Sequence, residues 1–91
     1  MEDILFTFHN THHSIMAESL LLGEKISVKV MPMPEAITAG CGLCLRLPEG
    51  DCLKALEILK QGSIIPRGIF KKTAGTYSNL PIERFYKSPS T

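Results

Sequence analysis

The residues best suited to chemistry in this chain are the cysteine of Gly40-Cys41-Gly42 and its two neighbours. Glycine on both sides removes the Cβ atoms that would shield the sulfur, and it permits positive φ angles through which successive N–H groups converge on an anion. A thiolate or a persulfide is such an anion. Cysteine is also commonly a buried, inert hydrophobe, but a core position rarely needs two flanking glycines. We predict that Cys41 is a nucleophilic or sulfur-carrying residue with Gly40 and Gly42 as its binding neighbours, and keep a structural turn and a ligand contact as alternatives.

A second cysteine, Cys44, follows at the spacing Cys-x-x-Cys. In dithiol redox sites with this spacing the first thiolate opens a helix, whereas here the pair enters an alternating apolar segment typical of a strand. Zinc binding by both thiolates and histidines is a further alternative, although the histidines lack the usual ligand spacing. We expect a lone reactive Cys41, a structural Cys44 that still counts among the candidate binding residues, and no metal or other cofactor. Cys52, next to the acidic Asp51, is expected to be structural.

Other candidate residues are a histidine cluster and one arginine. The histidines are His9, His12 and His13. We expect the first and third strands to be parallel neighbours, which would place the end of the first strand beside Leu47 and away from Cys41. Helix capping and packing are therefore the expected histidine roles. Arg46 is a candidate binding residue for an anion or a carboxylate, with simple solvation as the alternative.

The length, charge and cysteine count of the chain argue against several classes of protein, namely multidomain, nucleic-acid-binding, membrane and secreted proteins. A chain of 91 residues allows one domain with one small core. The net charge is +1, with Lys+Arg 10 against Asp+Glu 9, and no basic stripe is interleaved with aromatic residues, which argues against nucleic-acid binding. No apolar run approaches membrane-spanning length, and the first three residues, Met1-Glu2-Asp3, carry two acidic side chains where a signal peptide would be basic. Together with an odd number of cysteines, these features predict a cytoplasmic protein without nucleic-acid or membrane partners.

Hydrophobic periodicity predicts six elements in the order strand, helix, strand, strand, helix, strand. Their approximate ranges are 4–8, 12–22, 26–30, 42–47, 52–61 and 69–71. Asn10 or Thr11 should cap the first helix, Gly62 should end the second as its C′ residue, and Pro66 favours a sheet edge for the last strand. This order predicts an α+β, ferredoxin-like βαββαβ sandwich, with a four-stranded antiparallel sheet and two helices on one face. We expect one such domain over residues 1–72 and a polar C-terminal tail over residues 73–91.

The opposite face of this sheet would then be uncovered. Alternation places six residues on it: Leu5, Thr7, Lys29, Met31, Cys44 and Arg46. We expect this face to be solvated or to form a contact between two copies of the chain.

Four segments carry a resemblance to a known family: Phe8-His9-Asn10-Thr11-His12-His13, Pro32-Met33-Pro34, Cys41-Gly42 and Leu43-Cys44-Leu45-Arg46. With these segments, residues 4–72 resemble the selenium/sulfur carrier protein-like family of small bacterial proteins. The resemblance implies a cytosolic domain in which Cys41 carries sulfur or selenium as a persulfide or selenosulfide, and it implies a protein partner that donates or accepts that atom.

Two functions therefore compete. The first is a sulfur or selenium carrier, which is at most a sulfur-transfer partner with a cysteine nucleophile rather than an independent enzyme. The second is a non-enzymatic, dimeric binding or regulatory module that uses the open sheet face.

Overall fold

The computed structural model describes residues 3–34, 37 and 42–81. In this part of the chain, two helices and five strands follow one another, with a short 3-10 turn at Glu49–Asp51. The elements are β1 (Asp3–Thr7), α1 (Thr11–Gly23), β2 (Lys29–Pro32), β3 (Leu43–Pro48), α2 (Cys52–Gln61), β4 (Gly68–Thr73) and β5 (Thr76–Leu80). The fold is α+β, as predicted from the alternating and helical periodicities.

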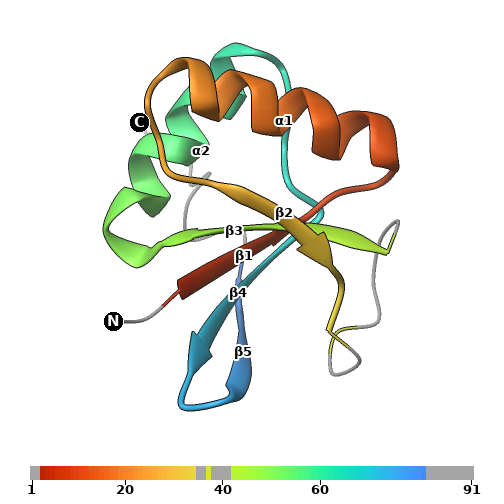
Figure 1. Ribbon diagram of the computed structural model, residues 1–91, viewed down its shortest axis with the longest axis vertical. Helices are drawn as coiled ribbons and strands as arrows, with labels where there is room; N and C mark the ends of the chain where they lie inside the picture. Colours follow the sequence, from red (N-terminus) through yellow and green to blue (C-terminus); the bar gives the residue numbers. More distant parts are fainter. Residues whose placement is uncertain (1–2, 35–36, 38–41, 82–91) are drawn as a thin grey trace, which may run out of the picture.

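The five strands form one antiparallel sheet in the order β2-β3-β1-β4-β5 (Figure 1). The expected number of four strands is wrong, because the polar segment Thr76–Leu80 pairs with β4. The expected edge position of the 69–71 strand is wrong for the same reason, since β4 lies between β1 and β5. The expectation of parallel first and third strands is also wrong: β1 and β3 are antiparallel, because the helix between β1 and β2 makes those two strands run the same way on either side of β3.

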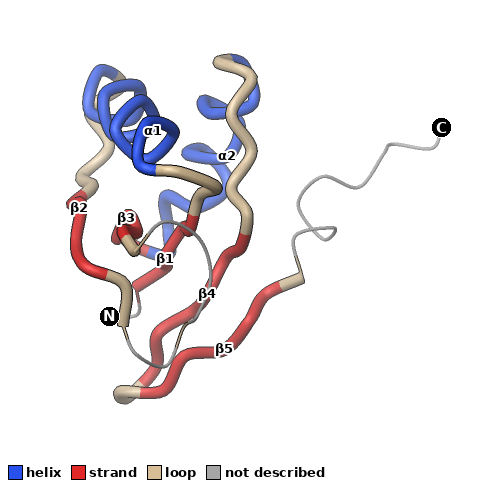
Figure 2. Tube along the Cα trace, turned by 90° about the vertical axis from the view of Figure 1, so that its right-hand side faces the viewer, coloured by secondary structure: helices blue, strands red, loops and turns tan. Residues whose placement is uncertain are grey.

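Both helices cover one face of the sheet, as predicted, and Figure 2 shows them on the same side of the strands. The core between the layers is built from alternate strand residues and from the inner faces of both helices. Its buried strand residues are Ile4, Phe6, Leu45, Leu47 and Ile69, and its buried helix residues are Ala17, Leu21, Cys52, Ala55, Leu56 and Leu59. Because strand side chains alternate, residues at every second position meet the helices and the others face the opposite side.

The start of α1 is capped as the sequence predicts. The Asn10 side-chain oxygen accepts a hydrogen bond from the backbone N–H of His13 at 2.8 Å, which satisfies one of the donors left over in the first helical turn. The cap fixes the point at which the chain leaves β1 and enters α1.

Both helices end in the same Schellman arrangement. At the end of α1, the N–H of Ile26 donates to the carbonyl of Leu21 and the N–H of Lys25 donates to that of Leu22. At the end of α2, Ile64 and Ser63 donate to Leu59 and Lys60 in the same way. The left-handed residue is Lys25 at φ 65° in one case and Ser63 at φ 63° in the other. Gly62, predicted as the C′ residue, instead occupies the preceding cap position at φ −90°.

The second face of the sheet is not open along its whole width. Leu5, Cys44 and Ile37 form a small buried cluster there, with Met31, Met33, Phe70 and Tyr77 packed against it. Thr7 is buried as well, whereas Lys29 and Arg46 are exposed. The expectation of a solvated or dimer-forming face is therefore wrong for Leu5, Thr7 and Cys44, which are buried within one chain. Ile37 and the β5 residue Tyr77 supply apolar cover for Leu5 and Cys44.

The β4–β5 hairpin extends the sheet at the end of the molecule remote from the helices (Figures 1 and 2). Its two-residue turn is Ala74 at φ 50° and Gly75 at φ 83°, and two successive positive φ angles are those of the type I′ turn that matches strand twist. Part of the segment expected as a polar tail is thus a sheet strand. Residues 82–91 of that expected tail lie outside the described residues.

Candidate functional site

The predicted nucleophile, Cys41, and its neighbour Gly40 lie outside the described residues, while Gly42 lies within them. Gly42 is exposed and has φ +89°, with nothing within 4 Å of the position that a Cβ atom would take. Its carbonyl accepts a hydrogen bond from the N–H of Met33 at 2.9 Å. The predicted positive φ is confirmed at Gly42, and the Met33–Gly42 bond joins the two ends of the connection that contains Cys41.

The strand directions decide which groups lie at this end of the sheet. In the antiparallel pair, Thr7 near the end of β1 is opposite Cys44 near the start of β3. Figure 1 shows the end of β1, the start of β3 and the start of α1 on the same side of the molecule. His9 and His12 are exposed there, and the rings of His12 and His13 have centroids 6.3 Å apart. The expected separation of the histidines from the start of the third strand is therefore wrong.

Cys44 lies in the core on the second face of the sheet. Its side chain is fully buried, and its Sγ lies 3.9 Å from the carbonyl oxygen of Pro32 on the neighbouring strand, to which the thiol donates. Leu5 and Ile37 belong to the same buried cluster. The geometry suits a packing role for this thiol and gives solvent no direct access to its sulfur.

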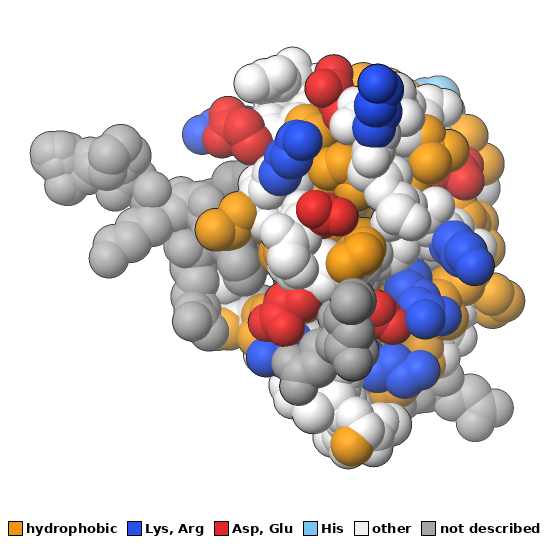
Figure 3. All heavy atoms as spheres, turned by 60° about the vertical axis from the view of Figure 1, so that its left-hand side comes forward, with side chains coloured by type: hydrophobic (Ala, Val, Ile, Leu, Met, Phe, Trp, Pro, Cys, Tyr) orange, Lys and Arg blue, Asp and Glu red, His pale blue; other side chains and the backbone are white. Residues whose placement is uncertain are grey.

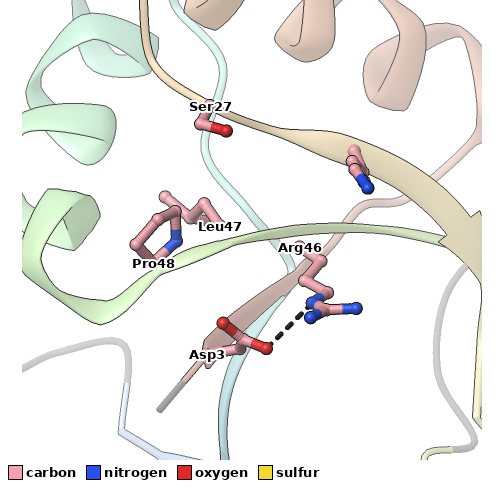
Figure 4. Close-up of a pocket in the computed structure, with 6 residues that line it drawn as sticks. Asp3, Ser27, Arg46, Leu47 and Pro48 are labelled. Atoms are coloured by element: carbon pink, nitrogen blue, oxygen red, sulfur yellow. Dashed lines mark hydrogen bonds and ion pairs between the residues drawn. The ribbon is translucent and has the colours of Figure 1, made fainter. Parts of the chain in front are cut away.

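Arg46 points to the same face as Cys44 but is exposed. Its Nε donates to Oδ2 of Asp3 at 2.8 Å across the β1–β3 pair. Both side chains line a pocket of about 130 Å³, and Figure 4 shows them pointing toward one another below β3. The remaining lining residues are Ser27, Lys29, Leu47 and Pro48. Arg46 is about 13 Å along the strand from Gly42, so the structure does not bring these two predicted residues into one site.

Sequence reasoning missed Asp3, Ser27 and Lys29 as part of this pocket. Asp3 lies two residues before Leu5, so the sequence places both side chains on the same face of the sheet. That placement points to Arg46 only when β1 and β3 are known to be antiparallel. In that register Asp3 lies opposite Pro48 and diagonal to Arg46, a distance that a long side chain can span.

Cys52 is buried at the start of α2. Burial raises the pKa of its thiol to about 11, and the nearby negative charge of Glu49 adds to this effect. The expected structural role agrees with this geometry, since a thiol that stays protonated near neutral pH is a poor nucleophile.

In residues 3–34, 37 and 42–81, no three His, Cys, Asp or Glu side chains lie together as a metal site would require. None of the helices described has the length and apolar character needed to cross a membrane.

Comparison with known proteins adds one finding to this geometry. Residues 3–71 match the family described as "Putative Se/S carrier protein-like". No curated protein and no solved structure was found to match the chain. The matched range spans β1 to β4 and includes the whole connection between β2 and β3. The chain therefore belongs to the Se/S carrier protein-like family.

Proposed function

We propose that this protein carries sulfur or selenium on Cys41, as a persulfide or a selenosulfide, and passes the atom to a partner protein. The observation that carries the proposal is the family match over residues 3–71, which contains Cys41 within a Gly-Cys-Gly sequence. A carrier needs an approachable sulfur and a surface for its partner more than it needs a deep pocket.

The residue bonded to Cys41 supports approach by a partner. Gly42 has open space around the position of a Cβ atom and a φ angle that favours glycine. The Met33–Gly42 hydrogen bond joins the residues that follow the edge strand β2 and precede β3, at the two ends of the connection. The described residues at the two ends of this connection, Met33 and Gly42, are therefore held together by a backbone hydrogen bond.

The transfer step is a thiol exchange. The Cys41 thiolate attacks the outer sulfur of a donor persulfide, a new S–S bond forms on Cys41, and the donor's S–S bond breaks to release the donor as a thiolate. Delivery is the same reaction with an acceptor thiolate as the attacking group. No net oxidation or reduction takes place, and protons equilibrate with solvent. With selenium, the transferred atom is held in an S–Se bond.

The other two cysteines are poor candidates for this step. Cys44 is fully buried and donates to a backbone carbonyl, and Cys52 is buried with a pKa of about 11. The carrier chemistry therefore assigns one reactive sulfur to the chain, and the Cys-x-x-Cys spacing does not imply a dithiol.

We also propose that the core of the domain is ferredoxin-like. The strand order β2-β3-β1-β4 with both helices on one face supports this topology, to which β5 adds an outer strand. A dimeric module is less well supported, because the apolar centre of the second face is already buried within one chain.

Intact-mass measurement tests the proposed function. The chain is incubated with a cysteine desulfurase and cysteine, and we expect the addition of one sulfur atom that a reducing agent removes. Cys41→Ser should abolish the addition, whereas Cys44→Ala and Cys52→Ala should retain it. No added sulfur in the wild-type chain, or the same addition in Cys41→Ser, would contradict the carrier function.

A further inference from the structure

The pocket lined by Arg46 and Lys29 lies where the sheet narrows. Strand β3 continues to Pro48, paired with β1, but its last partner on β2 is Lys29, opposite Arg46. Leu47 and Pro48 therefore have no strand neighbour on the β2 side, and Ser27 stands across from them before β2 begins, as Figure 4 shows. The gap beside the end of β3 forms the pocket.

The polar groups of this pocket are mainly hydrogen-bond donors. Lys29 and Arg46 are directly opposite one another in the register, so their side chains leave the same face of the sheet. Neither the Lys29 side chain nor the Ser27 side chain has a hydrogen bond or ion pair in the part of the chain that the structure describes. Because these donors have no acceptor among the described residues, the pocket suits an anionic ligand that can accept their hydrogen bonds.

Asp3 orients the arginine without using all of its donors. Its carboxylate binds Nε of Arg46 at 2.8 Å, and a guanidinium has further N–H groups on its two Nη atoms in a planar fork. That fork matches the two oxygens of a carboxylate. The ion pair therefore fixes the plane of the guanidinium and leaves its outer edge for a ligand.

The charge of the pocket favours a monoanion. Lys29 and Arg46 against Asp3 leave one net positive charge among the lining residues, and Lys72 lies opposite Asp3 on β4. Basic side chains also gather in the lower part of the surface seen in Figure 3, next to acidic ones. A dianion would meet repulsion from the Asp3 carboxylate, whereas one carboxylate group balances the lining.

We propose that this pocket binds a carboxylate group, held by the guanidinium of Arg46 and the ammonium of Lys29, with the Ser27 hydroxyl as a third donor. At about 13 Å from Gly42 along β3, a ligand there does not take part in bond making at Cys41. The site goes beyond the carrier function and stands independently of it. The carboxylate is either a free small molecule or an acidic side chain of another protein.

Two-dimensional NMR of the full ¹⁵N-labelled chain tests the site. The protein is titrated with sodium acetate, and in a control titration with sodium chloride at the same ionic strength. A third titration uses glutamate blocked at its amino and α-carboxyl groups, which leaves only the side-chain carboxylate. We expect saturable shifts of the amides of Ser27, Lys29 and Leu47 with a carboxylate and none with chloride. Saturation by acetate alone indicates a free small carboxylate, and saturation by both ligands indicates that an acidic side chain fits.

Matched variants make the test specific. Arg46→Gln and Lys29→Gln should each weaken apparent affinity by about tenfold, the scale of a lost charge-assisted hydrogen bond. Arg67→Gln and Lys54→Gln remove exposed cations that do not line the pocket and should leave the affinity unchanged. The Lys29 side chain has no hydrogen bond or ion pair with the described residues. Lys29→Gln is therefore expected to keep the fold and to serve as the test if Arg46→Gln unfolds. Equal shifts with chloride, tighter binding of phosphate than of acetate, or unchanged affinity in Lys29→Gln would overturn the proposal.

Discussion

Thr7 on β1 lies directly opposite Cys44 on β3 in an antiparallel pair of strands. This pairing brings the end of β1 to the start of β3, and the N–H of Arg67 donates to the Thr7 carbonyl at 2.7 Å at the same place. The start of α1 follows four residues after Thr7. The connection that contains Cys41 therefore enters β3 at the end of the sheet where β1 ends and α1 begins.

His9 follows the end of β1 by two residues, and Gly42, the residue bonded to Cys41, directly precedes β3 at the same end of the sheet. We therefore expect His9→Ala to slow alkylation of Cys41 by about threefold, because an imidazole N–H within reach of a thiolate favours that thiolate. The rate is measured with iodoacetamide and intact mass. Lys54→Gln, which removes an exposed cation on α2, is the control. An unchanged rate in His9→Ala would separate the histidines from the chemistry of Cys41.

The positive φ of Gly42 gives a second prediction, which concerns stability. Gly42→Ala should lower the free energy of unfolding by about 1–2 kcal/mol, because an alanine at φ +89° is strained although space is available for its Cβ. Gly50→Ala is the matched control, since Gly50 also has open space but has no positive φ. Urea unfolding midpoints compare the two. Equal effects at both positions would show that the connection relaxes to accommodate a side chain at residue 42.

The helices and most strands could be predicted from the sequence, because alternation of apolar residues and helix-capping residues are local signals that lie within a few positions of each element. Alternation of Ile4, Phe6 and Phe8 identified β1, and Asn10 identified the start of α1. Strand β5 was missed because Thr76–Leu80 is polar and exposed along most of its length. Its position in the sheet is set by pairing with β4 and by the contact of Tyr77 with the cluster of Leu5 and Cys44. Both are tertiary interactions that the local sequence does not indicate.

The site was predictable only in part, for a related reason. Cys41 and Gly42 stand out through their own neighbours, so the sequence alone is enough to name Cys41 as a candidate. The Asp3–Arg46 ion pair joins residues 43 positions apart, and its recognition depends on the relative direction of β1 and β3. A parallel arrangement would have separated Asp3 from Arg46 and would have placed the end of β1 away from the start of β3.

The ends of the two helices give a third prediction. Lys25 and Ser63 both occupy the left-handed position of a Schellman motif that usually holds glycine. Lys25→Gly and Ser63→Gly should each raise the free energy of unfolding by about 0.5–1 kcal/mol, because glycine adopts this conformation without strain. Gln61→Gly, in the last helical position of α2, should instead lower it by a similar amount. Thermal and urea unfolding give the sign, and a loss of stability in Ser63→Gly would contradict the assignment.

The thiol of Cys52 gives a prediction about alkaline pH. Its pKa is raised from 9.0 to about 11 in the folded chain, first by burial and then by the charge of Glu49. Between these two pH values the unfolded chain has lost this proton while the folded chain still holds it, so the contribution of Cys52 to stability is complete below pH 9 and is lost as the pH rises through 11. Cys52→Ala should remove this part of the alkaline decline in stability, and Glu49→Gln should reduce it, because the thiolate then meets less negative charge.

The comparison uses urea unfolding from pH 8 upward in wild type and both variants. Lys and Tyr titrate in the same range, so the difference between wild type and Cys52→Ala is the quantity to follow, and a difference that stays constant with pH would show that this thiol ionises alike in the folded and unfolded chain.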